Sequence, residues 1–299
     1  MWQHVAKPRV EKIRVPLPDD TWAVTQMLRL DELHVLMSGN KVFKLLPNIV
    51  AAKAAGAKGL LTFGGAFSNH IHATAAAGHH FNIPTIGVIR DTGAPQTPTL
   101  KDAVLWGMQL HRVDRQTYRR RHDPEWLETL QRQYPGFMVI PEGGSNDLAL
   151  QGCCELGEYI AELDIDHVLL ACGTGATARG VALGLRANQQ VHAVAVLPGI
   201  TREIEALSKI GAVCWENYHA GGYATLTDTI RQCVTNFEAA NAIRIDPVYT
   251  AKMLWAASDL FHKSELVAER TLLVHTGGLQ GRRGRPDVFA PQGNNRACT

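Results

Sequence analysis

Two lysines, Lys41 and Lys44, lie one helical turn apart where a polar, glycine-containing stretch runs into an apolar segment. The stretch reads Ser-Gly-Asn-Lys-Val-Phe-Lys-Leu over residues 38–45. A lysine amine that is partly desolvated, or held as a Schiff base, can act as a base or carry an electrophile near neutral pH. Most lysines are instead solvated surface charges. The chemistry of this pair therefore depends on what the rest of the chain places beside it.

A glycine-rich turn at residues 172–180, Cys-Gly-Thr-Gly-Ala-Thr-Ala-Arg-Gly, has the composition of a phosphate cradle. Convergent N–H groups, a helix dipole and two threonine hydroxyls would favour an anion there. The turn lacks the Gly-Lys-Ser/Thr of a Walker loop, and no acidic residue ends a strand about twenty positions on, as a dinucleotide fingerprint requires. A phosphate monoester suits the turn better than NAD, and a purely structural glycine turn is the alternative.

Four further turns carry polar groups. Gly-Gly-Ala-Phe-Ser-Asn-His at 64–70 offers N–H groups, a hydroxyl and an amide at a helix start, which suits a carboxylate as well as an ordinary Ser/Asn cap. The turns at 141–146, 246–250 and 275–281 add hydroxyl groups and a phenol, and each could be inert. Together the turns and lysines supply the parts needed to hold pyridoxal phosphate and an amino acid.

The elements that must position these groups alternate along the chain. Short β-branched runs and longer alanine- and leucine-rich segments predict a mostly parallel sheet with helices on both faces. We expect strands at 59–63, 85–89, 137–140, 167–171, 191–197, 212–214 and 271–274. We expect helices at 46–55, 68–78, 100–109, 148–163, 202–209, 226–239 and 249–263. Ligands of such sheets bind beyond the carboxyl ends of the strands, where the glycine turns fall.

Composition excludes several classes of protein. The chain of 299 residues is 45% apolar and 19% charged, which is typical of a soluble globular protein. A net charge of +2 is too small to indicate a nucleic-acid or membrane partner, so the arginine-rich clusters at 118–122 and 281–285 are interpreted as solvated loops. No spanning segment or secretory signal is visible. Cysteines without CxxC spacing indicate a cytoplasmic protein, and histidines without HExxH argue against a metal site.

The motifs at 38–44, 64–70, 142–146, 173–177, 246–250 and 275–278 together resemble the aminocyclopropane-carboxylate deaminase and D-cysteine desulfhydrase family of pyridoxal-phosphate enzymes. The resemblance spans about residues 38–281 in order. It implies the tryptophan synthase β-subunit fold (fold type II), with two three-layer α/β/α domains and mostly parallel sheets. We place a large cofactor-binding domain at 1–51 plus 151–299, and a small domain carrying the carboxylate loop at 52–150. The family also implies a homodimer.

The resemblance implies a role for the lysine and serine motifs. Lys41, directly after Gly-Asn, would bond covalently to the cofactor and act as the catalytic base, and Lys44 would be a second, unbonded lysine. The substrate carboxylate would be held by Ser68 and by the N–H groups of Asn69 and His70. Asn69 would also hydrogen-bond the ring hydroxyl of the cofactor.

The later motifs receive roles in the same way. Tyr249, and less securely Tyr223, would face the substrate as catalytic residues. The other expected cofactor-binding residues are the phosphate loop and two threonines: Gly173, Thr174, Gly175, Ala176, Thr177, Thr250 and Thr276.

Two of these positions separate the activities of the family. At the position of Thr250 the deaminases have a glutamate facing the pyridine nitrogen, and at the position of Thr276 they have a leucine. Both substitutions resemble the desulfhydrases. A neutral hydroxyl leaves the cofactor a weaker electron sink, which can suffice when a good leaving group departs from Cβ. We therefore expect a lyase that converts D-cysteine to pyruvate, sulfide and ammonia.

Other functions stay open at this point. The same scaffold could act as an aminocyclopropane-carboxylate deaminase, giving 2-oxobutyrate and ammonia, or on another amino acid. From different classes come a nicotinamide oxidoreductase and a non-catalytic protein that binds a phosphorylated ligand. The segment at 279–284, Leu-Gln-Gly-Arg-Arg-Gly, departs from the small apolar continuation of the family, and the first forty residues diverge as well. Both departures bear on substrate choice.

Overall fold

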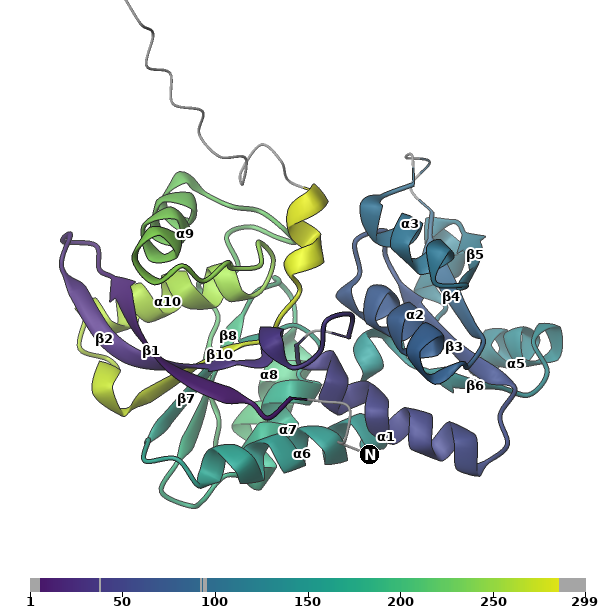
Figure 1. Cartoon of the computed structure of the whole chain (residues 1–299), viewed down its shortest axis with the longest axis horizontal. Coiled ribbons are helices and arrows are strands. Elements are labelled where there is room, and N and C mark those ends of the chain that lie inside the picture. The colour runs from purple at the N-terminus through teal and green to yellow at the C-terminus, as the bar shows by residue number, and fades with distance from the viewer. Residues whose placement is uncertain (1–5, 38, 92, 94–95, 285–299) are drawn as a thin grey trace, which may run out of the picture.

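The computed structural model describes residues 6–37, 39–91, 93 and 96–284. Ser38, Arg285 and Cys298 lie outside the described residues. Within the described part, the strands form two sheets (Figure 1). The larger has the order β1-β2-β10-β7-β8-β9, with β1 at Arg9–Pro16, β2 at Trp22–Arg29, β7 at His167–Cys172, β8 at Gln190–Ala195, β9 at Val213–Trp215 and β10 at Thr271–His275. The smaller has the order β5-β4-β3-β6, with β3 at Gly59–Gly64, β4 at Thr85–Arg90, β5 at Gln109–Val113 and β6 at Phe137–Ile140.

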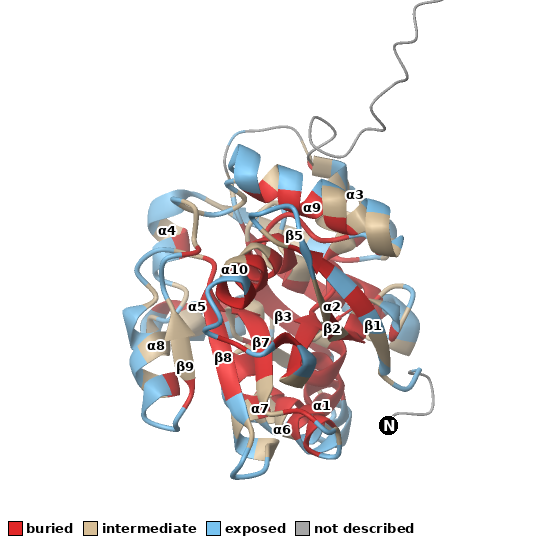
Figure 2. Cartoon of the chain, turned by 90° about the vertical axis from the view of Figure 1, so that its left-hand side faces the viewer, coloured by how far each residue is buried: buried red, intermediate tan, exposed pale blue. Residues whose placement is uncertain are grey.

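The larger sheet is parallel apart from the antiparallel β1–β2 hairpin at its edge. Helices cover both of its faces, each over its own apolar core. One face is covered by α1 (Lys41–Ala54), α6 (Asp147–Ala161), α7 (Ala176–Gly184) and α8 (Thr201–Ser208), and the other by α9 (Asp228–Asn241) and α10 (Thr250–His262). Figure 2 shows that β7 and β8, between these layers, are buried, as is α10 in one of them.

The smaller sheet is parallel throughout. One face packs against α2 (Asn69–Phe81) and α3 (Pro98–Leu105), and the other against α4 (Arg115–Arg119) and α5 (Pro124–Gln133). Each sheet is therefore the middle layer of an α/β/α arrangement, and the predicted fold class is confirmed.

Several predicted elements differ from those observed. The β1–β2 hairpin and the short helices α4 and α5 were not predicted from the sequence. The helix predicted at 100–109 is wrong at its end, because Gly107 has a φ of +87° and the chain turns there into β5. Helix α1 begins at Lys41 rather than at residue 46, which places the candidate lysine at a helix N-terminus.

The division into domains stays a prediction. Its boundaries at residues 51/52 and 150/151 fall inside α1 and α6. The core beside these two helices also includes Ala73, Ala76 and Ala77 of α2. The helices of the two sheets thus share one apolar cluster, and any relative movement of the sheets would have to preserve it.

The interpretation of both arginine-rich clusters as solvated loops is only partly right: Arg119, Arg120, His122 and Arg283 are exposed, but parts of both clusters form short helices and make buried or paired contacts. In the first cluster Tyr118 is buried, and Arg121 Nε donates to Glu142 Oε2 at 2.6 Å. In the second, the 3₁₀ helix η5 (Leu279–Gly284), drawn in yellow in Figure 1, stands between α9 and α3. There Arg282 Nη2 donates to Glu238 Oε2 at 3.1 Å.

No helix in the described ranges is both long and apolar enough to cross a bilayer. The described histidine, cysteine, aspartate and glutamate side chains nowhere gather in threes as a metal ion would need.

Candidate active site

Strands of both sheets end at one cavity of about 700 Å³. This volume is typical of small-molecule sites. The cavity lies beyond carboxyl ends of the strands, as expected for parallel sheets. Its lining includes most of the residues predicted from the sequence: Lys41, Ser68, Asn69, His70, Gly173, Thr174, Gly175, Thr177, Tyr223, Tyr249 and Thr276. The two predicted residues outside the lining are Ala176, at the start of α7, and Thr250, which is fully buried.

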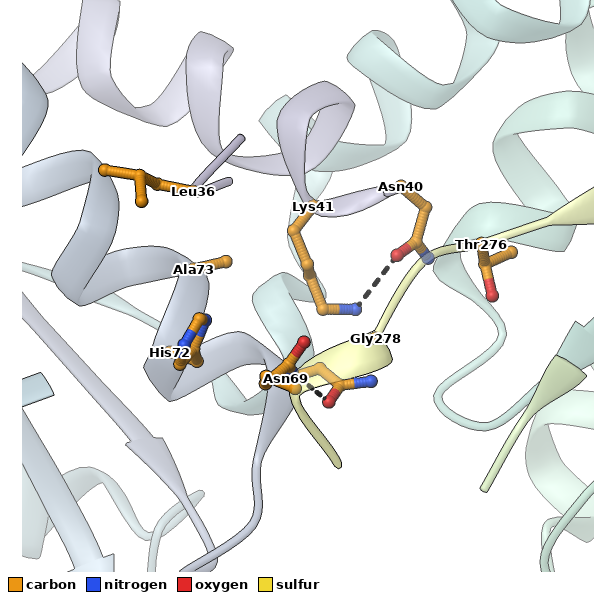
Figure 3. Close-up of a pocket in the computed structure, with 9 residues that line it drawn as sticks. Leu36, Asn40, Lys41, Asn69, His72, Ala73, Thr276 and Gly278 are labelled. Atoms are coloured by element: carbon orange, nitrogen blue, oxygen red, sulfur yellow. Dashed lines mark hydrogen bonds between the residues drawn. The ribbon is translucent and has the colours of Figure 1, made fainter. Parts of the chain in front are cut away.

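Lys41 is placed by a close approach between the start of α1 and the end of β10. Gly39 has a φ of +80°, and Asn40 N donates to the carbonyl oxygen of Thr276 at 3.2 Å. Asn40 Nδ2 also donates to Thr177 Oγ1 at 2.7 Å, which ties the N-termini of α1 and α7 together. Lys41 Nζ then lies 3.4 Å from Asn40 Oδ1, toward which it points (Figure 3). The sequence motif used Asn40 to identify Lys41 but predicted no role for the Asn40 side chain.

The two lysines have different surroundings. Burial and the neighbouring charge of Lys44 lower the pKa of Lys41 to about 7, because both disfavour the ammonium form. Burial lowers the pKa of Lys44 as well. The amine of Lys44, however, donates to the carbonyl oxygen of Gly143 at 3.1 Å, which holds it in a structural contact. The geometry favours Lys41 as the reactive amine.

The loop after β3 leads into the N-terminus of α2. Ser68 Oγ accepts the N–H of Ile71 at 3.3 Å, so the serine caps the helix. The N–H groups of Asn69 and His70 belong to the first helical turn, where no intrahelical acceptor exists. Capping leaves the Ser68 hydroxyl proton available, so the same turn can hold an anion.

His70 presents a buried acceptor to this region. Thr62 Oγ1 donates to the carbonyl oxygen of Ile140 at 2.8 Å, so its contact of 2.8 Å with His70 Nε2 requires the proton on Nε2. His70 Nδ1 is then an acceptor, and it is buried without a hydrogen bond to any described residue. Burial, with the charges of the two lysines, keeps the pKa of His70 well below its usual value. The imidazole is therefore neutral.

The glycine-rich turn predicted to bind a phosphate lies where β7 ends and α7 begins. Gly175 adopts a φ of +73° at the N-cap, which a residue with a side chain would adopt only with strain. The N–H groups of Thr177 and Ala178 follow in the first helical turn. The turn is bordered by the Tyr249 ring, whose Cε1 would lie 3.1 Å from a Cβ at Gly173. The predicted anion site and the predicted substrate-facing tyrosine are thus neighbours.

Asp246 organises the turn that carries Tyr249, a role not predicted from the sequence. Its fully buried carboxylate accepts the N–H groups of Val248 at 2.9 Å, Tyr249 at 3.0 Å and Thr250 at 2.6 Å. The start of α10 is fixed by these bonds. Its position between an isoleucine and a proline was the available sequence signal, since aspartate commonly caps helices.

Replacing Asp246 with asparagine is expected to lower the free energy of unfolding by about 2 kcal/mol, because one N–H would then face an amide donor instead of an acceptor. Chemical denaturation measures the change. The matched control is Asp228→Asn, whose carboxylate is exposed at the start of α9 and should cost less than about 0.5 kcal/mol. Equal effects of the two substitutions would contradict the organising role of Asp246.

The divergent segment 279–284 contacts residues at one side of the site. Gln280 Nε2 donates to Asn69 Oδ1, and the Arg283 guanidinium pairs with Asp102 of α3, with Nη1 3.2 Å from Oδ1. A smaller space of about 10 Å³, lined in part by Asn69 and Gln280, shares Lys41 with the main cavity (Figure 3). The segment thus fixes the amide of a predicted cofactor-binding residue, which sequence spacing alone could not reveal.

Comparison with known proteins places these features in context. The family model described as "pyridoxal-phosphate dependent enzyme" matches residues 23–277. The chain is 28% identical to a D-cysteine desulfhydrase of Klebsiella pneumoniae, covering 91% of this chain and 94% of the relative. It is 29% identical to a bifunctional D-cysteine desulfhydrase/1-aminocyclopropane-1-carboxylate deaminase, mitochondrial, of Arabidopsis thaliana, covering 85% of this chain and 72% of that one. A crystal structure of an ACC deaminase homologue superposes with a TM-score of 0.80 at 23% identity, covering 94% of this chain and 92% of that chain.

Proposed function

The chain belongs to the family of pyridoxal-phosphate dependent enzymes, and from this premise we propose that it is a lyase that eliminates the β-substituent of a small amino acid, with D-cysteine as substrate. The products would be pyruvate, sulfide and ammonia. The observation that carries this choice is Thr250, a buried neutral hydroxyl at the position where the deaminases resembled by this chain have a glutamate.

The residues of the cavity fit the cofactor. The N-terminus of α7 supplies N–H groups suited to a phosphate, and the neighbouring N-terminus of α1 supplies Lys41, whose amine is partly neutral at pH 7. Thr250 Oγ1 is buried without a hydrogen bond to any described residue, which is costly unless a bound group supplies a partner. Thr250 lies outside the cavity lining but directly follows Tyr249, which lines it, so a pyridine nitrogen placed against Tyr249 would be such a partner. When bound, pyridoxal phosphate withdraws electrons from the α-carbon of the amino acid.

The chain's own residues would bind the substrate and move its proton. Ser68 Oγ and the first N–H groups of α2 would hold the α-carboxylate, which orients the α-carbon in the cavity. Lys41 Nζ would remove the α-proton, since an amine with a pKa of about 7 is largely neutral just above that pH. Burial raises the pKa of the Tyr249 phenol, so this group would donate a hydrogen bond and not serve as a base.

Deamination of 1-aminocyclopropane-1-carboxylate is the second candidate, because the name of the Arabidopsis relative covers both activities. Membership in the family argues against a nicotinamide oxidoreductase and against a non-catalytic binder of phosphorylated ligands. We further propose a homodimer located in the cytoplasm. The described cysteines are free, as in a reducing compartment, and light scattering after size exclusion would test the dimer.

Supplying the purified holoenzyme with D-cysteine, L-cysteine and 1-aminocyclopropane-1-carboxylate tests the proposal. We expect sulfide and pyruvate from D-cysteine, with kcat/KM at least about tenfold above that for the cyclopropane substrate, because a neutral Thr250 leaves the weaker electron sink. Formation of 2-oxobutyrate as the main product would favour the second candidate. Absence of turnover with all three compounds would overturn the substrate assignment.

A further inference from the structure

Arg90 is a cation of the cavity for which the proposed mechanism has no use. It ends β4 and lines the cavity together with the groups described above. Its Nη2 lies 3.9 Å from where a Cβ on Gly65 would stand, so the guanidinium adjoins the loop that leads to Ser68. In an amino acid, the carboxylate and Cβ are both bonded to the α-carbon. A substituent on Cβ of a substrate anchored at Ser68 would therefore lie near the Arg90 guanidinium.

No described residue neutralises Arg90. Asp91, next to it in the chain, pairs with Arg112 at 3.5 Å. Glu142, the carboxylate that lines the cavity, already has a partner for each oxygen, because Oε2 accepts from Arg121 at 2.6 Å and Oε1 accepts from the Tyr118 hydroxyl at 2.7 Å. Within the described ranges, Arg90 makes no hydrogen bond or ion pair. The cavity thus carries an uncompensated guanidinium beside its carboxylate loop.

The field of Arg90 reaches across the cavity. Its positive charge partly offsets the rise in the pKa of Tyr118 and of Tyr223, which come from α4 and from the loop after β9. Arginine is suited to carboxylates, sulfonates and phosphates because its planar fork donates two parallel hydrogen bonds. In β-elimination the substituent leaves with its bonding electrons, so negative charge grows there, whereas opening a cyclopropane expels no anion. A cation at this point stabilises the first reaction selectively.

We propose that Arg90 determines specificity by binding an anionic group on Cβ, an inference that rests on the proposed function. The substrates are then amino acids whose β-substituent is an anion or leaves as one: a thiolate, a sulfonate or a phosphate ester. With cysteate, Lys41 Nζ would take the α-proton, and the Cβ–S bond would break with its electron pair leaving on sulfite. One water is consumed and pyruvate and ammonia complete the products, with no external oxidant or reductant.

Binding of non-eliminated ligands tests the role of Arg90 separately from turnover. Aspartate and asparagine have nearly the same shape and differ in the charge on the β-substituent, and alanine has no polar β-substituent. Calorimetry with the D- and L-forms should show aspartate binding to the holoenzyme about tenfold more tightly than asparagine. In Arg90→Met this ratio should fall to about one with alanine affinity unchanged, and Arg90→Lys should keep part of it. Arg186→Met removes an exposed cation that pairs with Glu162 and does not line the cavity, so this matched control should keep the whole ratio.

Each other outcome has a distinct meaning. Equal weakening of all three ligands by Arg90→Met would show that Arg90 holds the α-carboxylate, and equal affinity of the unaltered enzyme for aspartate and asparagine would show a solvated surface cation. Either result overturns the proposal. A charge preference that depends on Arg90, found in an enzyme that eliminates neither cysteine nor cysteate, would support the anion site and refute the lyase assignment. Release of sulfite from cysteate, reduced about tenfold in Arg90→Met, would support both.

Discussion

Replacing Lys41 with methionine should abolish elimination, lowering kcat/KM by about 10³-fold or more, because the substitution removes the amine proposed as the base. The protein should also lose its covalent, borohydride-reducible pyridoxal phosphate. Lys44→Met is the matched control: Lys44 lies one turn further along α1, and its amine contacts the carbonyl oxygen of Gly143. We expect Lys44→Met to keep the covalent cofactor. Retention of that link in Lys41→Met and its loss in Lys44→Met would show that the two lysines have been assigned the wrong way round.

The same substitution should stabilise the cofactor-free protein. Burial lowers the pKa of Lys41 from 10.5 to about 7, so the unfolded chain binds more protons than the folded one between those values. The folded state therefore loses stability as pH falls through this window, and the penalty is complete below pH 7. Lys41→Met should raise the free energy of unfolding by on the order of 2 to 4 kcal/mol at pH 7 or below, and by little above pH 10.5. A gain that does not change with pH would point to packing rather than charge.

Local sequence patterns were informative where structure is decided locally. The apolar run at 167–171 became β7, which extends one residue further to Cys172, and the glycine turn after it begins α7 as expected. Because carboxyl ends of parallel strands share an edge, glycine turns far apart in the chain could be predicted to meet. The residues predicted from these turns mostly line one cavity.

Patterns failed where the structure depends on long-range partners. The β-branched residues of Arg-Val-Glu-Lys-Ile-Arg-Val at the start of β1 are a strand signal, yet the β1–β2 hairpin joins the sheet because β2 pairs with β10, with Gln26 opposite Leu272. Side-chain roles for Asn40, Arg90 and Gln280 emerged only from contacts or locations across the fold. Spacing reports which residues share a face of one element, and it does not report which element comes to lie opposite.

The second large effect, on the free energy of unfolding, is expected from Gly39→Ala, at the close approach of α1 to β10. Gly39 combines a φ of +80° with a close approach, since a Cβ there would overlap the carbonyl oxygen of Thr276 and lie 2.8 Å from Gly277 Cα. Backbone atoms on both sides cannot yield as a flexible side chain would. We expect a loss of at least about 3 kcal/mol in the free energy of unfolding, with impaired cofactor binding, because the hydrogen bond from Asn40 N to Thr276 must also shift.

The comparison that isolates the steric part is Gly56→Ala, at the end of α1. Gly56 has a similar φ of +63°, but a Cβ there would meet nothing within 4 Å. Alanine at that position should cost only the strain of a left-handed conformation, about 1 kcal/mol. The difference between the two variants in chemical denaturation, about 2 kcal/mol, measures how tightly the start of α1 is held against β10. If both substitutions cost the same, the contact between Gly39 and Thr276 is loose, and the placement of Lys41 must depend on the bond from Asn40 to Thr177 instead.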